Sequence, residues 1–253
     1  VLFFALKDLG PALLLSLVFL TMFAVARGHA AMATVGLAAL VAGFYAGHTF
    51  GISNTLSARV AMWQSPWENA ARGGDQVAQA LWALASGAVS GSGLGLGATR
   101  YVPAGHTDLA LAAVAEELGV AGVMAVLAAF SIIAWRGLRL SRRASTDYGF
   151  FLALGMTLTL VIPALVIAAG MLGVIPLTGV VTPFLSYGGS AMVINFVALG
   201  LLAACARSAG PAGISQPFGL PLRWLGRTLA TVTVVLVVVW ARVQVVSADQ
   251  FLV

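Results

Sequence analysis

Residues 149–172 read GFFLALGMTLTLVIPALVIAAGML, a long apolar run without a charged side chain. A helix needs about 20 consecutive apolar residues to cross the hydrocarbon core of a bilayer, so this run predicts a transmembrane helix. Similar runs lie on both sides of it, and residues 1–7 resemble the tail of one more. The sequence therefore indicates a polytopic membrane protein, with predicted spans near 9–26, 31–50, 111–135, 149–172, 188–206 and 224–241.

The composition supports this fold class. Hydrophobic residues make up 60% of the 253 residues and charged residues only 8%, whereas soluble domains carry about 25% charged residues. The sequence lacks the alternating ten-residue segments of a membrane barrel. Cys205 is the only cysteine, which excludes an internal disulfide. We expect an all-α, polytopic transmembrane helical bundle, and the start at Val1 within an apolar run predicts a piece of a longer protein.

The arginines predict how the bundle is oriented. Four of them lie in the 136–148 connection, which the positive-inside rule places in the cytoplasm. Arg27, Arg207, Arg223 and Arg227 then fall on the same side. The high pI of about 10.1 is explained by these loops and does not require a nucleic-acid partner. The long 51–110 segment, the 173–187 loop and the C-terminal tail are predicted to face outward.

The outward 51–110 segment contains its own predicted structure. From Asp75 to Ser86, polar residues recur at helical spacing among apolar ones, as in an interfacial amphipathic helix. The glycine-rich run 91–97 resembles a dinucleotide-binding loop, but no strand precedes it and no suitably spaced acid follows. We interpret it as a tight turn whose backbone approaches a lipid headgroup or another helix.

Asp108 is the residue whose position most needs an explanation. The chain has eight acidic residues, and three of them (Asp108, Glu116 and Glu117) lie within ten positions at the start of a predicted span. A carboxylate where water meets lipid is costly and suggests a functional site. The alternative is that Thr107 or Asp108 caps the following helix, and spacing alone leaves both open. Helical spacing separates Glu116 and Glu117 from Asp108, so we expect them to tie this helix to a neighbour.

Candidate partners for an anionic ligand lie in the same outward region. Arg59, Arg72 and Arg100 suit phosphate oxygens through paired hydrogen bonds, although anchoring to lipid headgroups is the alternative for each. Lys7 and Asp8 form a possible ion pair at the outer end of the first complete span.

Two further groups complete the candidate site. His106 is placed to orient Asp108, but the three histidines of the sequence have no spacing that predicts a metal site. Ser186, Tyr187 and Gly188 open a span after two prolines, where backbone amides can face an anion.

Four blocks of the sequence resemble one known family. They are Asp8-Leu-Gly10-Pro-Ala; Gln76-Val-Ala-Gln79 with Gly91-Ser-Gly-Leu-Gly95-Leu-Gly97; His106-Thr-Asp108 through Glu116-Glu-Leu-Gly119; and Pro176-Leu-Thr-Gly179 through Pro183-Phe-Leu-Ser-Tyr-Gly-Gly-Ser190. In this order they resemble the SEDS proteins (shape, elongation, division and sporulation) of the RodA/FtsW type. Residues 1–207 resemble the later half of the ten-helix family fold.

The resemblance implies a peptidoglycan glycosyltransferase that polymerises lipid II into glycan strands on the outer face of the bacterial cytoplasmic (inner) membrane. The family's essential aspartate falls on Asp108, which implies a general base and inversion at the donor sugar. The diphosphate would be stabilised by the outward arginines or by a divalent cation such as Mg or Mn. The expected substrate-binding residues are Arg59, Arg72, Gln76, Gln79, Arg100, His106, Thr107, Ser186, Tyr187 and Gly188, with Lys7, Asp8, Glu116 and Glu117 in supporting roles.

Residues 208–253 extend beyond this resemblance. They predict a cytoplasmic linker, an extra transmembrane helix and the start of an extracellular region. This tail weakly resembles the anchor helix of class B penicillin-binding proteins, which implies such a transpeptidase as a partner or a fused domain.

Two other functions are open from the sequence. A flippase for lipid-linked precursors would carry charge deep inside several spans, whereas the charges here gather at the outer mouth. A non-catalytic scaffold for division or elongation would tolerate the loss of Asp108.

Overall fold

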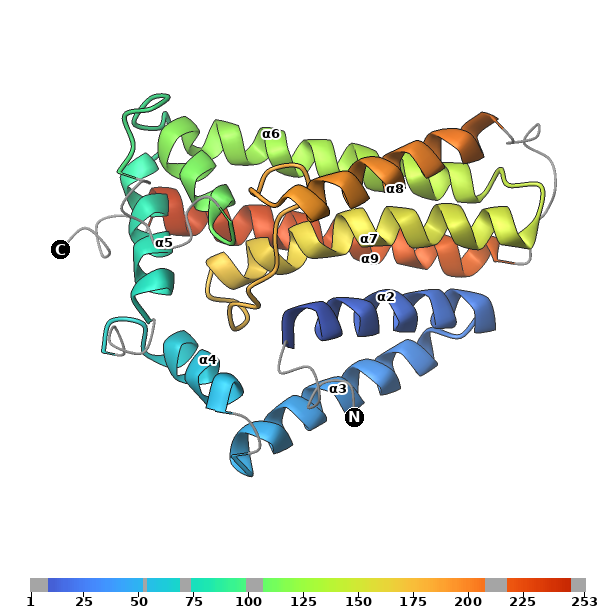
Figure 1. Cartoon of the computed structure of the whole chain (residues 1–253), viewed down its shortest axis with the longest axis horizontal. Coiled ribbons are helices and arrows are strands. Elements are labelled where there is room, and N and C mark those ends of the chain that lie inside the picture. The colour runs from blue at the N-terminus through green and yellow to red at the C-terminus, as the bar shows by residue number, and fades with distance from the viewer. Residues whose placement is uncertain (1–8, 52–53, 69–73, 99–106, 208–217, 247–253) are drawn as a thin grey trace.

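The computed structural model describes residues 9–51, 54–68, 74–98, 107–207 and 218–246 (Figure 1). All regular elements in these ranges are helical, which confirms the predicted all-α fold. The helices are α2 (Leu9–Arg27), α3 (Ala30–Thr49), α4 (Asn54–Gln64), α5 (Gly74–Gly87), α6 (Ala110–Ser141), α7 (Asp147–Met171), α8 (Gly189–Arg207) and α9 (Gly219–Ala241), with the π-helical turn η3 (Arg242–Val246) after α9.

Six of the described helices are long and apolar enough to cross a membrane, namely α2, α3, α6, α7, α8 and α9. They correspond to the six predicted spans. The largest differences are at the end of α6 and the start of α9, where the helices include arginines that the predicted spans place in connections. Arg136 and Arg139 lie over the ring of Trp135 at 5.5 and 5.6 Å from its centroid. Long basic side chains can lie along a helix and keep their charge in water, so a charge does not end the helix.

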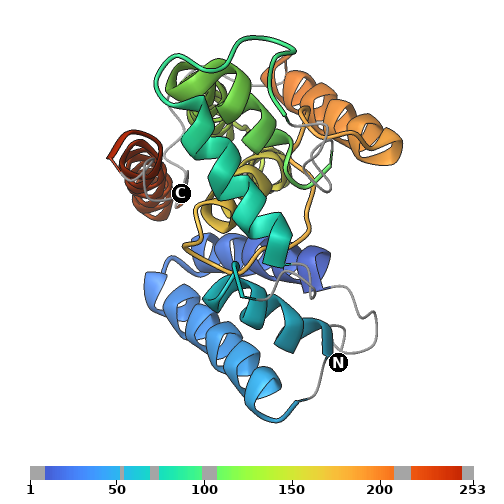
Figure 2. The same ribbon diagram turned by 90° about the vertical axis from the view of Figure 1, so that its left-hand side faces the viewer.

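Helix α7 forms the centre of the bundle. Of its span 72% is buried, against 6% for α3. In both views α6, α8, α9 and α2 surround α7, while α3 diverges from the rest at the edge (Figures 1 and 2). A small residue permits the closest helix contact: a side chain at Gly137 of α6 would collide with Thr157 of α7.

The two ends of the bundle differ in charge. Arg27 ends α2, Arg139 lies in the last turn of α6, Arg207 ends α8 and Arg223 lies in the second turn of α9. These four helix ends lie at the right-hand side of Figure 1. Helices α4 and α5 and the loop 172–188 lie at the opposite end. The chain is therefore a multi-pass helical bundle with one basic end, as the predicted orientation requires.

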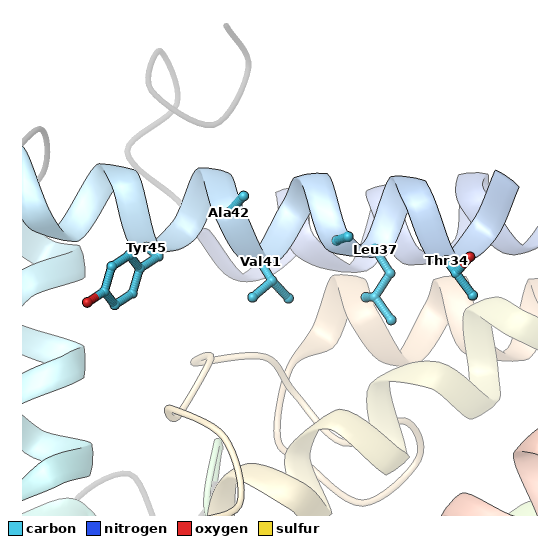
Figure 3. A pocket seen from close by; sticks show the side chains of 6 residues that line it. Thr34, Leu37, Val41, Ala42 and Tyr45 are labelled. Atoms are coloured by element: carbon cyan, nitrogen blue, oxygen red, sulfur yellow. The ribbon is translucent and has the colours of Figure 1, made fainter. Parts of the chain in front are cut away.

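One side of α3 forms a shallow apolar hollow of about 600 Å³ (Figure 3). Its lining comes from this one helix: Thr34, Leu37, Ala38, Val41, Ala42 and Tyr45. None of these side chains carries a charge at neutral pH. An apolar face of this kind is suited to contact with lipid or other helices.

Candidate functional site

Two short helices lie across the end of the bundle opposite the arginine-rich end. Helix α5 is the predicted amphipathic helix, and Ala80, Leu81 and Leu84 on its apolar side are buried against α6. Figure 2 shows α5 crossing this end of the molecule. Helix α4 is a further short helix of the kind expected in the 51–110 segment. Its position was not predicted, because its single pair of buried residues, Leu56 and Val60, gives a weak pattern.

Helix α6, which follows Asp108, is interrupted near its beginning. Gly119 has φ 62° and ψ −157°, so a short part, 110–118, is set apart from the long part, 120–141. In a continuous helix the carbonyls of residues 115–117 would accept bonds from residues 119–121. Around the break, these carbonyls accept hydrogen bonds from residues outside the helix. Ser92 donates to the Glu116 carbonyl from its backbone N (2.9 Å) and its Oγ (3.1 Å), and the Gly93 N donates to the Glu117 carbonyl (3.0 Å).

The glycine loop makes this contact possible. Gly91, Gly93 and Gly95 all have positive φ, and a side chain on Gly91 would collide with the Glu117 carbonyl. A Cβ on Gly119 would lie 2.5 Å from the Gly91 N. The prediction that this loop approaches another helix is confirmed.

The Glu116 side chain also forms a hydrogen bond close to this loop. Its Oε1 accepts a hydrogen bond from the Ala98 N at 2.8 Å, and only 4% of the residue is exposed. Glu117 contacts the loop through its carbonyl. The supporting roles expected for both residues stay a prediction.

The alternative that Thr107 or Asp108 caps α6 is wrong. The N-cap of α6 is Leu109, and no side chain caps this helix end. The reason is hydrophobic: Leu109 is buried in the core beneath α5, and its carbonyl accepts the first bond of the helix, from the Ala112 N at 2.8 Å. Asp108 is thereby left in a turn ahead of the helix.

Asp108 lines a cavity of about 240 Å³ at the junction of four segments. The other lining residues are Thr55, Ala58, Arg59 and Met62 from α4, Gln76 and Val77 from α5, and Leu177 and Gly179 from the loop after α7. Burial raises the pKa of the Asp108 carboxyl above its ordinary value of 3.8, and the charge of Arg59 offsets part of this increase. The cavity therefore combines a half-buried carboxylate with a nearby guanidinium.

Arg59 is positioned by the loop that follows α7. Its Nη1 donates to the Leu177 carbonyl at 2.7 Å. Gly179 has φ 69°, and a Cβ there would lie 2.8 Å from the Arg59 Nη2, so only glycine leaves room for the guanidinium. Trp63 fixes the same helix by donating from Nε1 to the Gly173 carbonyl at 2.6 Å. Leu177 and Gly179 are site residues absent from the predicted set, although both belong to the quoted block that begins at Pro176.

Ser186 connects this loop to the turn that carries Asp108. Its buried hydroxyl donates to the Thr107 carbonyl at 2.5 Å and accepts from the Thr182 N at 2.8 Å. Both contacts are internal and fix the backbone beside Asp108. Tyr187 is exposed, and Gly188 immediately precedes α8.

The remaining predicted site residues do not all lie at the cavity. Gln79 lies partly buried on α5, outside the lining of the cavity. The other predicted site residues lie outside the described ranges: Lys7, Asp8, Arg72, Arg100 and His106.

The described residues do not offer a ready metal site. No group of three or more His, Cys, Asp or Glu side chains among them is placed to hold an ion. Asp108 is the one carboxylate in the described lining of the cavity.

Comparison with known proteins identifies the family. Residues 1–210 match the family model for FtsW, RodA and SpoVE, described as cell cycle proteins. The chain belongs to the FtsW/RodA/SpoVE family. The SEDS resemblance is thereby confirmed, and the cavity, the glycine loop and the broken helix lie within the matched residues.

Curated relatives carry informative names. The chain is 37% identical over 204 residues to the peptidoglycan glycosyltransferase RodA of Mycobacterium leprae, covering 80% of this chain and 43% of that protein. It is 37% identical over 146 residues to the stage V sporulation protein E of Bacillus subtilis, covering 57% and 40%. A probable peptidoglycan glycosyltransferase FtsW of Alkalilimnicola ehrlichii is 38% identical over 149 residues, covering 57% and 37%. The chain thus spans less than half the length of these relatives.

Proposed function

We propose that this chain carries the catalytic site of a peptidoglycan glycosyltransferase that polymerises lipid II on the outer face of the bacterial cytoplasmic membrane. The observation that carries the proposal is the pairing of Asp108 and Arg59 in one cavity at the non-basic end of the bundle. The names of the RodA and FtsW relatives support the same reaction class.

Asp108 acts as the general base in this proposal. Its carboxylate accepts the proton of the acceptor sugar's 4-hydroxyl as that oxygen attacks the anomeric carbon of the donor. The bond from the anomeric carbon to the diphosphate oxygen breaks, the electron pair leaves with undecaprenyl diphosphate, and the configuration inverts. Partial burial suits this role, because a base with a raised pKa holds a proton more strongly.

Arg59 supplies positive charge for the departing diphosphate. A guanidinium has five N–H donors in a planar array that matches phosphate oxygens. Its bond to Leu177 orients it before the substrate arrives. Preorganised charge of this kind is an effective way to stabilise a leaving anion.

The expected divalent cation remains a proposal. Mg²⁺ is often held by one or two carboxylates together with substrate phosphates, and Asp108 is the described carboxylate that fits such a set. A cation would neutralise diphosphate charge, and it would depend on the substrate for most of its ligands.

We retain the proposal that a class B penicillin-binding protein acts with this chain as a partner or a fused domain. The support is the additional span α9, which lies beyond the family match. Reading the gene beyond Val253 tests the fused form, which fails if no extracellular domain follows.

Polymerisation of purified lipid II by the full-length protein tests the catalytic proposal. We expect Asp108→Asn to abolish glycan synthesis while the melting temperature stays unchanged, because the amide cannot accept the proton. Asp147→Asn, at the basic end, is the matched control and should remain active. An active Asp108→Asn protein would refute the role of base and would favour a scaffold.

A further inference from the structure

The C-terminal end of α9 reaches the candidate site from outside the family match. The match ends at residue 210, whereas α9 and η3 cover residues 219–246. The η3 turn packs against α5, and α9 packs along α6. Gln244 and Trp240, which lie on this end of the chain, are both buried. A buried amide is unusual enough to need an explanation, because burying it without hydrogen bonds is unfavourable.

Both ends of the Gln244 carboxamide are hydrogen-bonded. Its Oε1 accepts from the Trp240 Nε1 at 2.9 Å, and its Nε2 donates to the Ala115 carbonyl at 3.0 Å. Trp240 therefore fixes which end of the amide points at α6. The Ala115 carbonyl is the first of the three acceptors at the Gly119 break, and Ser92 and Gly93 serve the other two. Leaving a buried carbonyl without a hydrogen-bond donor is unfavourable.

The Ala115 carbonyl belongs to the short helical part that directly follows Asp108. The break at Gly119 separates this part from the long span, so the long span alone does not fix its position. It is held by packing against α5, by the glycine loop and by Gln244. From Ala115 back to Asp108 the chain has seven residues, or about 10 Å at helical rise. A small rotation of the 110–118 segment therefore displaces the carboxylate.

We propose that Gln244 is a positioning residue for Asp108: its carboxamide, oriented by Trp240, holds the 110–118 segment and so fixes where the general base lies in the cavity. This inference rests on the proposed function, because the importance of the position depends on the reaction. Reacting groups are sensitive to such shifts, and a misplacement of about 1 Å can lower a rate by about 100-fold.

Gln244→Met in the full-length protein is the main test, because methionine has a similar volume and forms neither hydrogen bond. We expect kcat for lipid II polymerisation to fall about tenfold with KM within twofold, since substrate contacts remain. Amide hydrogen exchange in 110–118 should become faster, while exchange in α7 is unchanged. Val245→Met changes the adjacent, half-exposed residue and is the matched control, with wild-type kinetics and exchange expected.

Trp240→Phe provides a second variant that keeps Gln244 and removes the indole N–H donor, with a smaller ring in its place. It should change kcat and exchange in the same direction, and the double variant should be no worse than Gln244→Met, because the two residues act in one chain. Trp240→Phe also tests the positioning role of Gln244 if the Gln244→Met protein fails to fold.

Several results would overturn the inference. They are wild-type kcat in the Gln244→Met protein, faster exchange with unchanged kcat, or equal loss in the Val245→Met control. If the wild-type protein does not polymerise lipid II, the proposed function fails first. The exchange measurement then still reports whether Gln244 holds the 110–118 segment.

Discussion

Asp108 and Arg59 reach one cavity by different means. Asp108 is placed by its neighbours, because Leu109 is buried in the core and Ser186 holds the Thr107 carbonyl. Arg59 is placed by a loop more than a hundred residues further along the chain, through Leu177 and the open space at Gly179. The pair therefore depends on contacts that are distant in sequence.

The pH dependence of the reaction reports on this pair. The base must be deprotonated, and burial raises its pKa, so activity should be lost on acidification at a higher pH than for an ordinary carboxyl. Arg59 lowers the pKa of Asp108, and its removal should raise that pKa further. We therefore expect Arg59→Gln to shift the acidic limb of kcat/KM to higher pH as well as lowering the rate.

Arg59→Lys is the control for this measurement, because it keeps the positive charge. Its acidic limb should move less than that of Arg59→Gln, even though its rate also falls. An acidic limb that stays in place in Arg59→Gln would show that the two side chains do not interact as described.

At the scale of elements, the spans could be predicted and the break in α6 could not. Hydropathy identifies each long helix because lipid-crossing length is a strong constraint. A glycine such as Gly119 within an apolar run is compatible with a continuous helix, and its unusual backbone depends on Gly91 and Ser92, which lie far earlier in the chain.

The charged residues of the site could be predicted from the sequence, and the residues that position them could not. Asp108 and Arg59 stood out as charges in an apolar chain. The roles of Leu177 and Gln244 arise from a backbone carbonyl and from a contact between distant segments, and neither leaves a local pattern.

The glycine contact at the break makes a stability prediction. Gly119→Ala places a side chain at positive φ, which costs about 1–3 kcal/mol, and its Cβ would lie 2.5 Å from the Gly91 N and the Val89 carbonyl. We expect a lower melting temperature in detergent and loss of polymerisation.

Gly200→Ala is the matched control, because Gly200 lies in α8 with open space around its Cα. It should melt at or slightly above the wild-type temperature, since alanine favours a helix. Equal melting of the two variants would contradict the tight contact at Gly119.

At the scale of the whole molecule, charge separates the two ends of the bundle. The basic residues gather where α6 meets α7 and where α8 and α9 meet their connections, while Asp108 lies at the opposite end. A reaction on the outer membrane face requires the basic end to lie inside, which is the orientation that arginine-rich loops favour.

Cysteine labelling of intact cells tests this orientation. In a Cys205→Ser background, Val174→Cys (46% exposed, after α7) should react with a membrane-impermeant maleimide. Ser145→Cys, between α6 and α7, should react only after the membrane is permeabilised. The reverse pattern would place Asp108 in the cytoplasm and exclude extracellular polymerisation.

The interruption at Gly119 also has a mechanical consequence. A helix unbroken from Ala110 to Ser141 would behave as one rigid rod, and any tilt imposed by a thinner or thicker bilayer would move Asp108 with it. Because the helix is interrupted at Gly119 and the short part has its own attachments to α5, the glycine loop and η3, we expect a change in the tilt of the long part to move the short part less. The depth of the Asp108 carboxylate below the membrane surface would then vary less with the thickness of the bilayer.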